Sequence, residues 1–213
     1  MSYSFNEATV MIKKATRGAG CSWSLAEEVS YAASCLWQNS LPACEIAVQF
    51  LDFVIQAQCT LKTYRPQELH LECWQSAKGV LCPVQSGLVF ADCASFMPVR
   101  TILFEGFIAA PLFLPFAMRA AKVWKQPLRI KGEGLDVLLD AQQLEVHCFE
   151  LHGQKMLRLE PWARAPAPKS YAVRANPNSK AWGQLEKMAY KTYAPATEAS
   201  RLRGAGAGLS DND

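Results

Sequence analysis

The chain has 213 residues, of which 50% are hydrophobic and 19% are charged, and its formal net charge is +3. This composition excludes wholesale disorder and allows one substantial core, so we expect a single domain over residues 1–213. The weak positive charge, spread along the chain, argues against a nucleic-acid partner. The longest charge-free apolar stretch, residues 106–118, is shorter than the about 20 residues of a membrane helix, which argues against a membrane partner.

Eight cysteines occur, none with C-x-x-C spacing, and no secretory signal precedes them. We therefore expect reduced, mostly buried thiols and a cytoplasmic protein. The three histidines and the cysteines show no zinc-ligand spacing, and no nucleotide signature is present, so the sequence predicts neither a metal nor a cofactor.

Residues 1–58 show helical periodicity in three segments. Ser4-x-x-Glu7 and Ser24-x-x-Glu27 are capping boxes, which predict helices that begin near residues 5 and 24. Pro42 fits the first turn of a third helix.

The middle of the chain, residues 70–162, contains short β-prone runs, and residues 176–193 contain a last helix with Asn176 as its expected N-cap. Alternation on both sides of residues 152–154 predicts a hairpin there. A helix near residues 110–125 interrupts the strands. The predicted strands are residues 87–91, 100–104, 128–130, 144–149 and 155–159.

This order of elements predicts an α+β fold. We expect the N-terminal three-helix segment to pack on a mixed or antiparallel sheet, together with one long central helix and a C-terminal helix. Residues 195–213 form a glycine-rich tail, which composition alone would describe as disordered.

An Arg-Gly-Ala-Gly motif occurs twice, at residues 17–20 and 203–206. Neither copy is a dinucleotide fingerprint or a P-loop; in the first copy Trp23 occupies the third glycine position. The first copy follows a predicted helix, which should end at Gly18 or Gly20 in a left-handed C-cap. We therefore keep a purely structural interpretation of this copy open.

The alternative is an anion site, because exposed amides at a helix start and arginine side chains both favour negative charge. In such a site Glu28 is the one acid placed to act as a catalytic general base, although an ordinary first-turn acid also explains it. The expected ligand-binding residues are Arg17, Gly18, Gly20, Ser22, Trp23, Arg201, Arg203, Gly204 and Gly206.

The motifs Arg-Gly-Ala-Gly-x-Ser-Trp-x-x-Ala-Glu-Glu at residues 17–28 and Gly-Ala-Gly-Ala-Gly-Leu-Ser-Asp-Asn-Asp at residues 204–213 resemble those of a bacterial, mostly proteobacterial, protein family of unknown function. The resemblance covers the whole chain. It implies a single domain whose two ends act together, and it implies no activity or catalytic residue.

Three hypotheses follow. In the first, a cytoplasmic protein binds, and as an enzyme transforms, a small anionic metabolite at the two end motifs. In the second, a non-catalytic interaction module docks its glycine-rich tail on itself or on a partner. In the third, a homo-oligomer exchanges tails between subunits. The sequence leaves open whether the protein is an enzyme.

Overall fold

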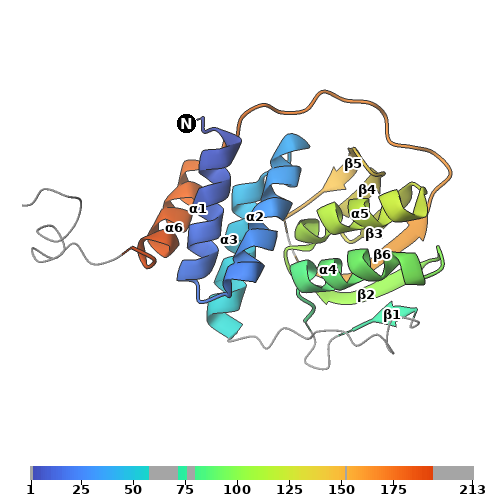
Figure 1. Ribbon diagram of the computed structural model, residues 1–213, viewed down its shortest axis with the longest axis horizontal. Coiled ribbons are helices and arrows are strands. Elements are labelled where there is room, and N and C mark those ends of the chain that lie inside the picture. The colour runs from blue at the N-terminus through green and yellow to red at the C-terminus, as the bar shows by residue number, and fades with distance from the viewer. Residues whose placement is uncertain (1, 58–71, 76–79, 152, 194–213) are drawn as a thin grey trace, which may run out of the picture.

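The computed structural model describes residues 2–57, 72–75, 80–151 and 153–193. Four helices pack together beside a β-sheet (Figure 1). α6 contacts α1 and α3, and α2 contacts the same two helices. These helices are α1 (Phe5–Gly18), α2 (Trp23–Gln38), α3 (Ala43–Ala57) and α6 (Ser179–Tyr190).

The sheet has six strands in the order β1-β2-β6-β3-β4-β5. β1 is parallel to β2 and every other pair is antiparallel, so the sheet is mixed. The strands are β1 (Cys73–Trp74), β2 (Ile102–Phe107), β3 (Leu128–Gly132), β4 (Leu135–Leu139), β5 (Leu144–Phe149) and β6 (Gln154–Pro161).

Two further helices, α4 (Pro83–Cys93) and α5 (Leu114–Trp124), lie over one face of the sheet (Figure 1). A short 3-10 turn, η2 (Ala94–Phe96), follows α4, and another, η3 (Ala110–Phe113), precedes α5. α2 packs against α4, η3 and α5, so the four-helix group contacts the layer of helices that covers the sheet.

An aromatic cluster joins the sheet to this layer. Its ring centroids lie 4.8 to 6.0 Å apart, and the rings come from β1, β2, α4 and η3. Burial of such large rings dominates core energetics, at roughly 25 cal/mol per Å² of apolar surface. The cluster consists of Trp74, Phe90, Phe104, Phe107 and Phe113.

The expected α+β class is confirmed, with three N-terminal helices, a mixed sheet, a central helix and a C-terminal helix. The cap at Ser4 is also confirmed, since its Oγ accepts a hydrogen bond of 3.1 Å from the Glu7 amide. The predicted strands at residues 100–104, 128–130, 144–149 and 155–159 correspond to β2, β3, β5 and β6.

The strand predicted at residues 87–91 is wrong, because this run lies inside α4. A short apolar run has no periodicity that separates a strand from a buried helix. The deciding signals precede the run. Pro83 lies in the first turn of the helix, and Cys82 Sγ accepts a hydrogen bond of 3.4 Å from the Gln85 amide.

The hairpin predicted around residues 152–154 is also wrong. β5 and β6 are not neighbours, because β3 and β4 lie between them in the sheet. A tight hairpin turn occurs earlier in the chain, at Glu133-Gly134 between β3 and β4, where Gly134 has a φ of +70°. Residue 152 itself lies outside the described residues.

Two predicted N-caps are displaced by two residues. α2 begins at Trp23, and its N-cap is Ser22 rather than Ser24, so no capping box forms with Glu27. α6 begins at Ser179 with Asn178, not Asn176, as its N-cap. In both cases another side chain with an acceptor oxygen lies nearby, and the tertiary contacts decide which one caps the helix.

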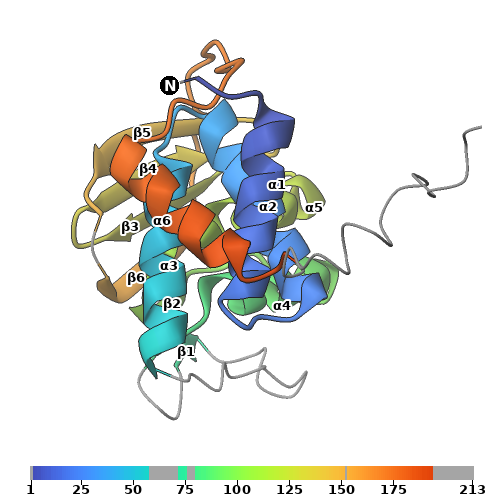
Figure 2. The same cartoon turned by 90° about the vertical axis from the view of Figure 1, so that its left-hand side faces the viewer.

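The first and last helices lie side by side and run in the same direction (Figure 2). Near their N-terminal ends, the rings of Tyr3 and Trp182 stack with centroids 3.8 Å apart, and the Tyr3 amide donates to the Ala175 carbonyl at 2.9 Å. The C-terminal ends of the two helices therefore also converge, beside the start of α2.

Candidate functional site

The first Arg-Gly-Ala-Gly copy ends α1 in a Schellman motif. The Gly20 amide donates to the Arg17 carbonyl at 2.9 Å, and the Cys21 amide donates to the Thr16 carbonyl at 3.2 Å. Gly20 has a φ of +93°, in the left-handed region that favours glycine. Gly20 therefore shapes the loop that leads into α2.

Gly18 has a different structural role, at the crossing of α1 and α6. A β-carbon at this position would lie 1.8 Å from the Met188 carbonyl oxygen, a distance that no packing tolerates. Both glycines of the first Arg-Gly-Ala-Gly copy thus have backbone functions. The side chains that remain for a ligand are those of Arg17, Ser22 and Trp23.

The Arg17 guanidinium lies 4.7 Å from the centroid of the Trp23 ring and donates a hydrogen bond to the Cys21 carbonyl. Lys13 Nζ lies 5.9 Å from the same ring and forms an ion pair with Glu27 at 2.8 Å. Despite these contacts, Trp23 is 59% exposed. An exposed tryptophan held beside two cations is typical of a binding surface.

The start of α2 adds hydrogen-bond donors to this surface. Ser22 Oγ caps the Leu25 amide at 3.2 Å, and the Ser22 carbonyl accepts from the Ala26 amide at 3.0 Å. Within the described part of the chain, the amides of Trp23 and Ser24 have no acceptor. Such amides and the helix dipole favour a negative charge in front of the helix.

Lys14, one turn before Gly18, contributes a further positive charge. Its Nζ lies 3.2 Å from the Tyr193 hydroxyl and 4.7 Å from the centroid of that ring. No carboxylate of the described residues lies within 4.0 Å of Lys14 or Arg17. We call this surface the α1/α2 corner and define it as Lys13, Lys14, Arg17, Ser22 and Trp23.

Sequence reasoning missed the two lysines of the corner. The signal was present, because Lys13 and Lys14 lie four and three positions before Arg17, which is the spacing of neighbours on a helix surface. The second half of the predicted site, Arg201, Arg203, Gly204 and Gly206, lies outside the described residues.

Glu28 lies on the side of α2 that faces α5. Its Oε2 is 3.7 Å from Arg119 Nη1, is shielded from solvent and has no hydrogen-bond partner. Arg119 also lies 4.0 Å from the centroid of the Tyr31 ring. The structure therefore brings Glu28 together with Arg119 and Tyr31 rather than with Arg17, and its catalytic role stays a prediction.

The nearby thiols are poor nucleophiles. Burial raises the pKa of the Cys35 thiol, beside Tyr31, and burial also raises the pKa of Cys21, although Arg17 opposes this shift. A reactive cysteine needs a lowered pKa. We therefore find no support for cysteine chemistry next to the corner or next to Glu28.

Residues 3–73 match DUF3726, a family described as a protein of unknown function. The matched range contains α1, α2 and α3, and with them the first Arg-Gly-Ala-Gly copy and every residue of the corner. It does not contain the second copy. No curated protein and no solved structure matches the chain significantly.

The similarity to DUF3726 supports the resemblance to a family of unknown function over residues 3–73. Two further observations concern the described residues alone. They contain no group of three or more histidine, cysteine, aspartate or glutamate side chains arranged to hold a metal ion. None of their helices has the length and apolar character needed to cross a bilayer.

Proposed function

We propose that the protein binds a small anionic molecule at the α1/α2 corner. The observation that carries this proposal is the exposed Trp23 ring beside Arg17 and Lys13. A phosphate or carboxylate group in front of α2 accepts from the Trp23 and Ser24 amides and from the Arg17 fork, and the flat part of the ligand contacts the indole.

Charge supports this choice of ligand. Glu27 neutralises Lys13, whereas Lys14 and Arg17 have no carboxylate partner among the described residues. The corner therefore carries a net positive charge, which favours the binding of an anion. We also propose a cytoplasmic location, because the seven described cysteines are free thiols.

The binding test uses isothermal titration calorimetry with orthophosphate, pyrophosphate and citrate. Arg17→Gln should weaken binding of the preferred anion by about tenfold or more, because a charge-assisted fork is lost. Lys155→Gln removes an equal charge from an exposed position on β6 and serves as the matched control. The proposal fails if none of the three anions binds, or if both variants bind equally well.

A second candidate function has its own observation. Tyr193, the last described residue of the C-terminal segment, contacts Lys14 at the corner, so residues 194–213 begin beside it. In this alternative the tail, which ends in Asp211-Asn212-Asp213, occupies the corner of its own chain or of a partner. Deleting residues 204–213 then lowers the melting temperature and strengthens anion binding. If the tail instead supplies ligand contacts through Gly204 and Gly206, the truncation weakens anion binding.

A further inference from the structure

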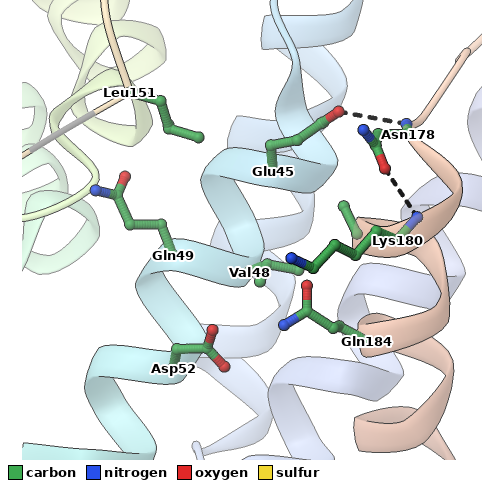
Figure 3. A pocket seen from close by; sticks show the side chains of 9 residues that line it. Glu45, Val48, Gln49, Asp52, Leu151, Asn178, Lys180 and Gln184 are labelled. Atoms are coloured by element: carbon green, nitrogen blue, oxygen red, sulfur yellow. Dashed lines mark hydrogen bonds between the residues drawn. The ribbon is translucent and has the colours of Figure 1, made fainter.

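A second candidate site lies between α3 and α6, away from the corner. It is a cleft of about 380 Å³, which is within the size range of small-molecule sites. Figure 3 shows polar side chains from both helices directed toward this space. The cleft is lined by Glu45, Val48, Gln49, Asp52, Leu151, Asn178, Lys180, Ala181 and Gln184.

Opposite charges face one another across the cleft without forming an ion pair. Lys180 extends from α6 toward α3, where Glu45 and Asp52 lie on the same side of the helix (Figure 3). Seven positions separate these two acids, about 10 Å along the helix axis. Among the described residues, no carboxylate lies within 4.0 Å of Lys180 and no cation lies within 4.0 Å of Asp52.

One residue that lines the cleft has an unsatisfied acceptor. Gln49 Oε1 is shielded from solvent and has no hydrogen-bond partner. A buried acceptor without a donor costs free energy, so such groups usually mark a place where a water or a ligand donates. In Figure 3 the Gln49 side chain points toward Leu151 and away from Lys180, so it offers an additional acceptor at the Leu151 end of the cleft, separate from Asp52.

Glu45 is already partly engaged. Its Oε1 accepts a hydrogen bond of 3.3 Å from the Asn178 amide, which fixes the start of α6 against α3. Asp52 therefore remains as an acceptor for a cationic donor, and Lys180 remains as a donor for an anionic acceptor. Val48 and Ala181 supply apolar contact between these two ends.

We infer that this cleft binds a small zwitterion that carries an ammonium and a carboxylate group, the chemistry of an amino acid. The ammonium donates to the Asp52 carboxylate. The carboxylate accepts from Lys180. Because two acids and one lysine line the cleft, a purely anionic ligand is repelled, which separates this site from the α1/α2 corner.

The test is saturation-transfer NMR followed by calorimetry on the full chain, with the common L-amino acids and 4-aminobutyrate as probes. Butylamine and butyrate are the matched single-charge probes. We expect at least one zwitterion to bind, and both single-charge probes to bind about tenfold more weakly because each lacks one charged contact. Butylamine binding as tightly as the zwitterion would overturn the role given to Lys180.

Variants then locate the binding. Asp52→Asn and Lys180→Gln should each weaken zwitterion binding by about tenfold. Glu133→Gln, in the exposed β3–β4 turn, and Arg17→Gln, at the corner, should leave it unchanged. The inference is overturned if no probe binds at millimolar concentration, or if neither Asp52→Asn nor Lys180→Gln affects binding. Melting temperatures equal to that of the wild type confirm that the variants are folded.

Discussion

Gly18 in the first helix touches the backbone of Met188 in the last. A β-carbon at Gly18 would lie 1.8 Å from the Met188 carbonyl oxygen, so only glycine permits α1 and α6 to cross at this distance. The crossing brings the C-terminal end of α6, and with it Tyr193, next to Lys14 and the start of α2. The glycine motif thus builds the α1/α2 corner through the backbone.

Three glycine-to-alanine substitutions separate packing from backbone strain. Gly18→Ala should lower the free energy of unfolding by more than about 2 kcal/mol, because α6 must move. Gly20→Ala should cost about 1 kcal/mol, since space is free there and only the positive φ is strained. Chemical denaturation measures both values.

Gly183→Ala is the matched control for this series. Gly183 lies inside α6, and a β-carbon there meets no atom within 4 Å. Alanine should therefore stabilise the protein by up to about 1 kcal/mol through its higher helix propensity. Equal effects of all three substitutions would contradict the packing role of Gly18.

Asn39 connects three parts of the fold. Its Oδ1 accepts from the Leu144 amide of β5 at 3.2 Å, its Nδ2 donates to the Cys35 carbonyl at 2.9 Å, and its carbonyl accepts from Lys169 Nζ at 2.9 Å. Asn39→Ala leaves the Leu144 amide without a partner and should cost about 2 to 3 kcal/mol. Gln38→Ala, at the exposed neighbouring position, should change the free energy of unfolding by less than about 0.5 kcal/mol.

The sequence predicts elements well where the signal is local. Ser4 has its capping oxygen three residues before the Glu7 amide, and the structure uses this cap. The strand at residues 128–130 is bounded and β-prone, and it forms β3. In these places the local preference and the tertiary contacts agree.

The errors arise where distant contacts decide. Gly87 looks like part of a strand, yet a β-carbon there would lie 2.5 Å from the Phe116 ring, so the glycine allows α4 to approach α5 closely. β6 leaves β5 and inserts between β2 and β3, which no nearby residue signals. At the site, the structure brings Arg17 and Trp23 of the first motif into contact. Glu28 instead faces Arg119 of α5, a contact between distant residues that the sequence does not indicate.

The Arg129–Asp136 pair predicts a stability change at acid pH. Arg129 donates two hydrogen bonds, of 2.9 and 2.7 Å, to the two Asp136 oxygens, and this fork lowers the pKa of Asp136. A carboxyl whose folded pKa is lowered stabilises the fold above its unfolded pKa and loses this contribution as pH falls through the folded pKa.

Asp136→Asn should therefore cost about 1 to 2 kcal/mol at pH 7, and the difference from the wild type should shrink below about pH 4. Urea unfolding at a series of pH values measures it. Glu160→Gln removes an acid whose arginine partner, Arg158, is 55% exposed, and should cost less than about 0.5 kcal/mol. A pH-independent difference for Asp136→Asn would contradict the assigned role of this pair.

The buried Cys44 thiol should make the free energy of unfolding fall at alkaline pH. Burial raises the pKa of its thiol from 9.0 to about 12, so the native state keeps the proton that the unfolded chain releases. The raised folded pKa means that stability is complete below pH 9 and falls between pH 9 and about 12, by about 1.4 kcal/mol per pH unit for this group. Cys44→Ala should unfold with a shallower alkaline slope in the same urea experiment. Equal slopes for the two proteins would show that Cys44 is not protected.

The central claim, an anion site at the α1/α2 corner, is tested most directly by following the Trp23 indole N–H in ¹⁵N-labelled protein. Trp23→Phe assigns its resonance among the six tryptophans. During titration with orthophosphate, pyrophosphate or citrate, the Trp23 indole and the Ser24 amide should shift with one saturable curve. Arg17→Gln should raise the midpoint of this curve by about tenfold or more, and Lys155→Gln should leave the midpoint unchanged. No saturable shift with any of the three anions, or the wild-type midpoint in Arg17→Gln, would contradict the account.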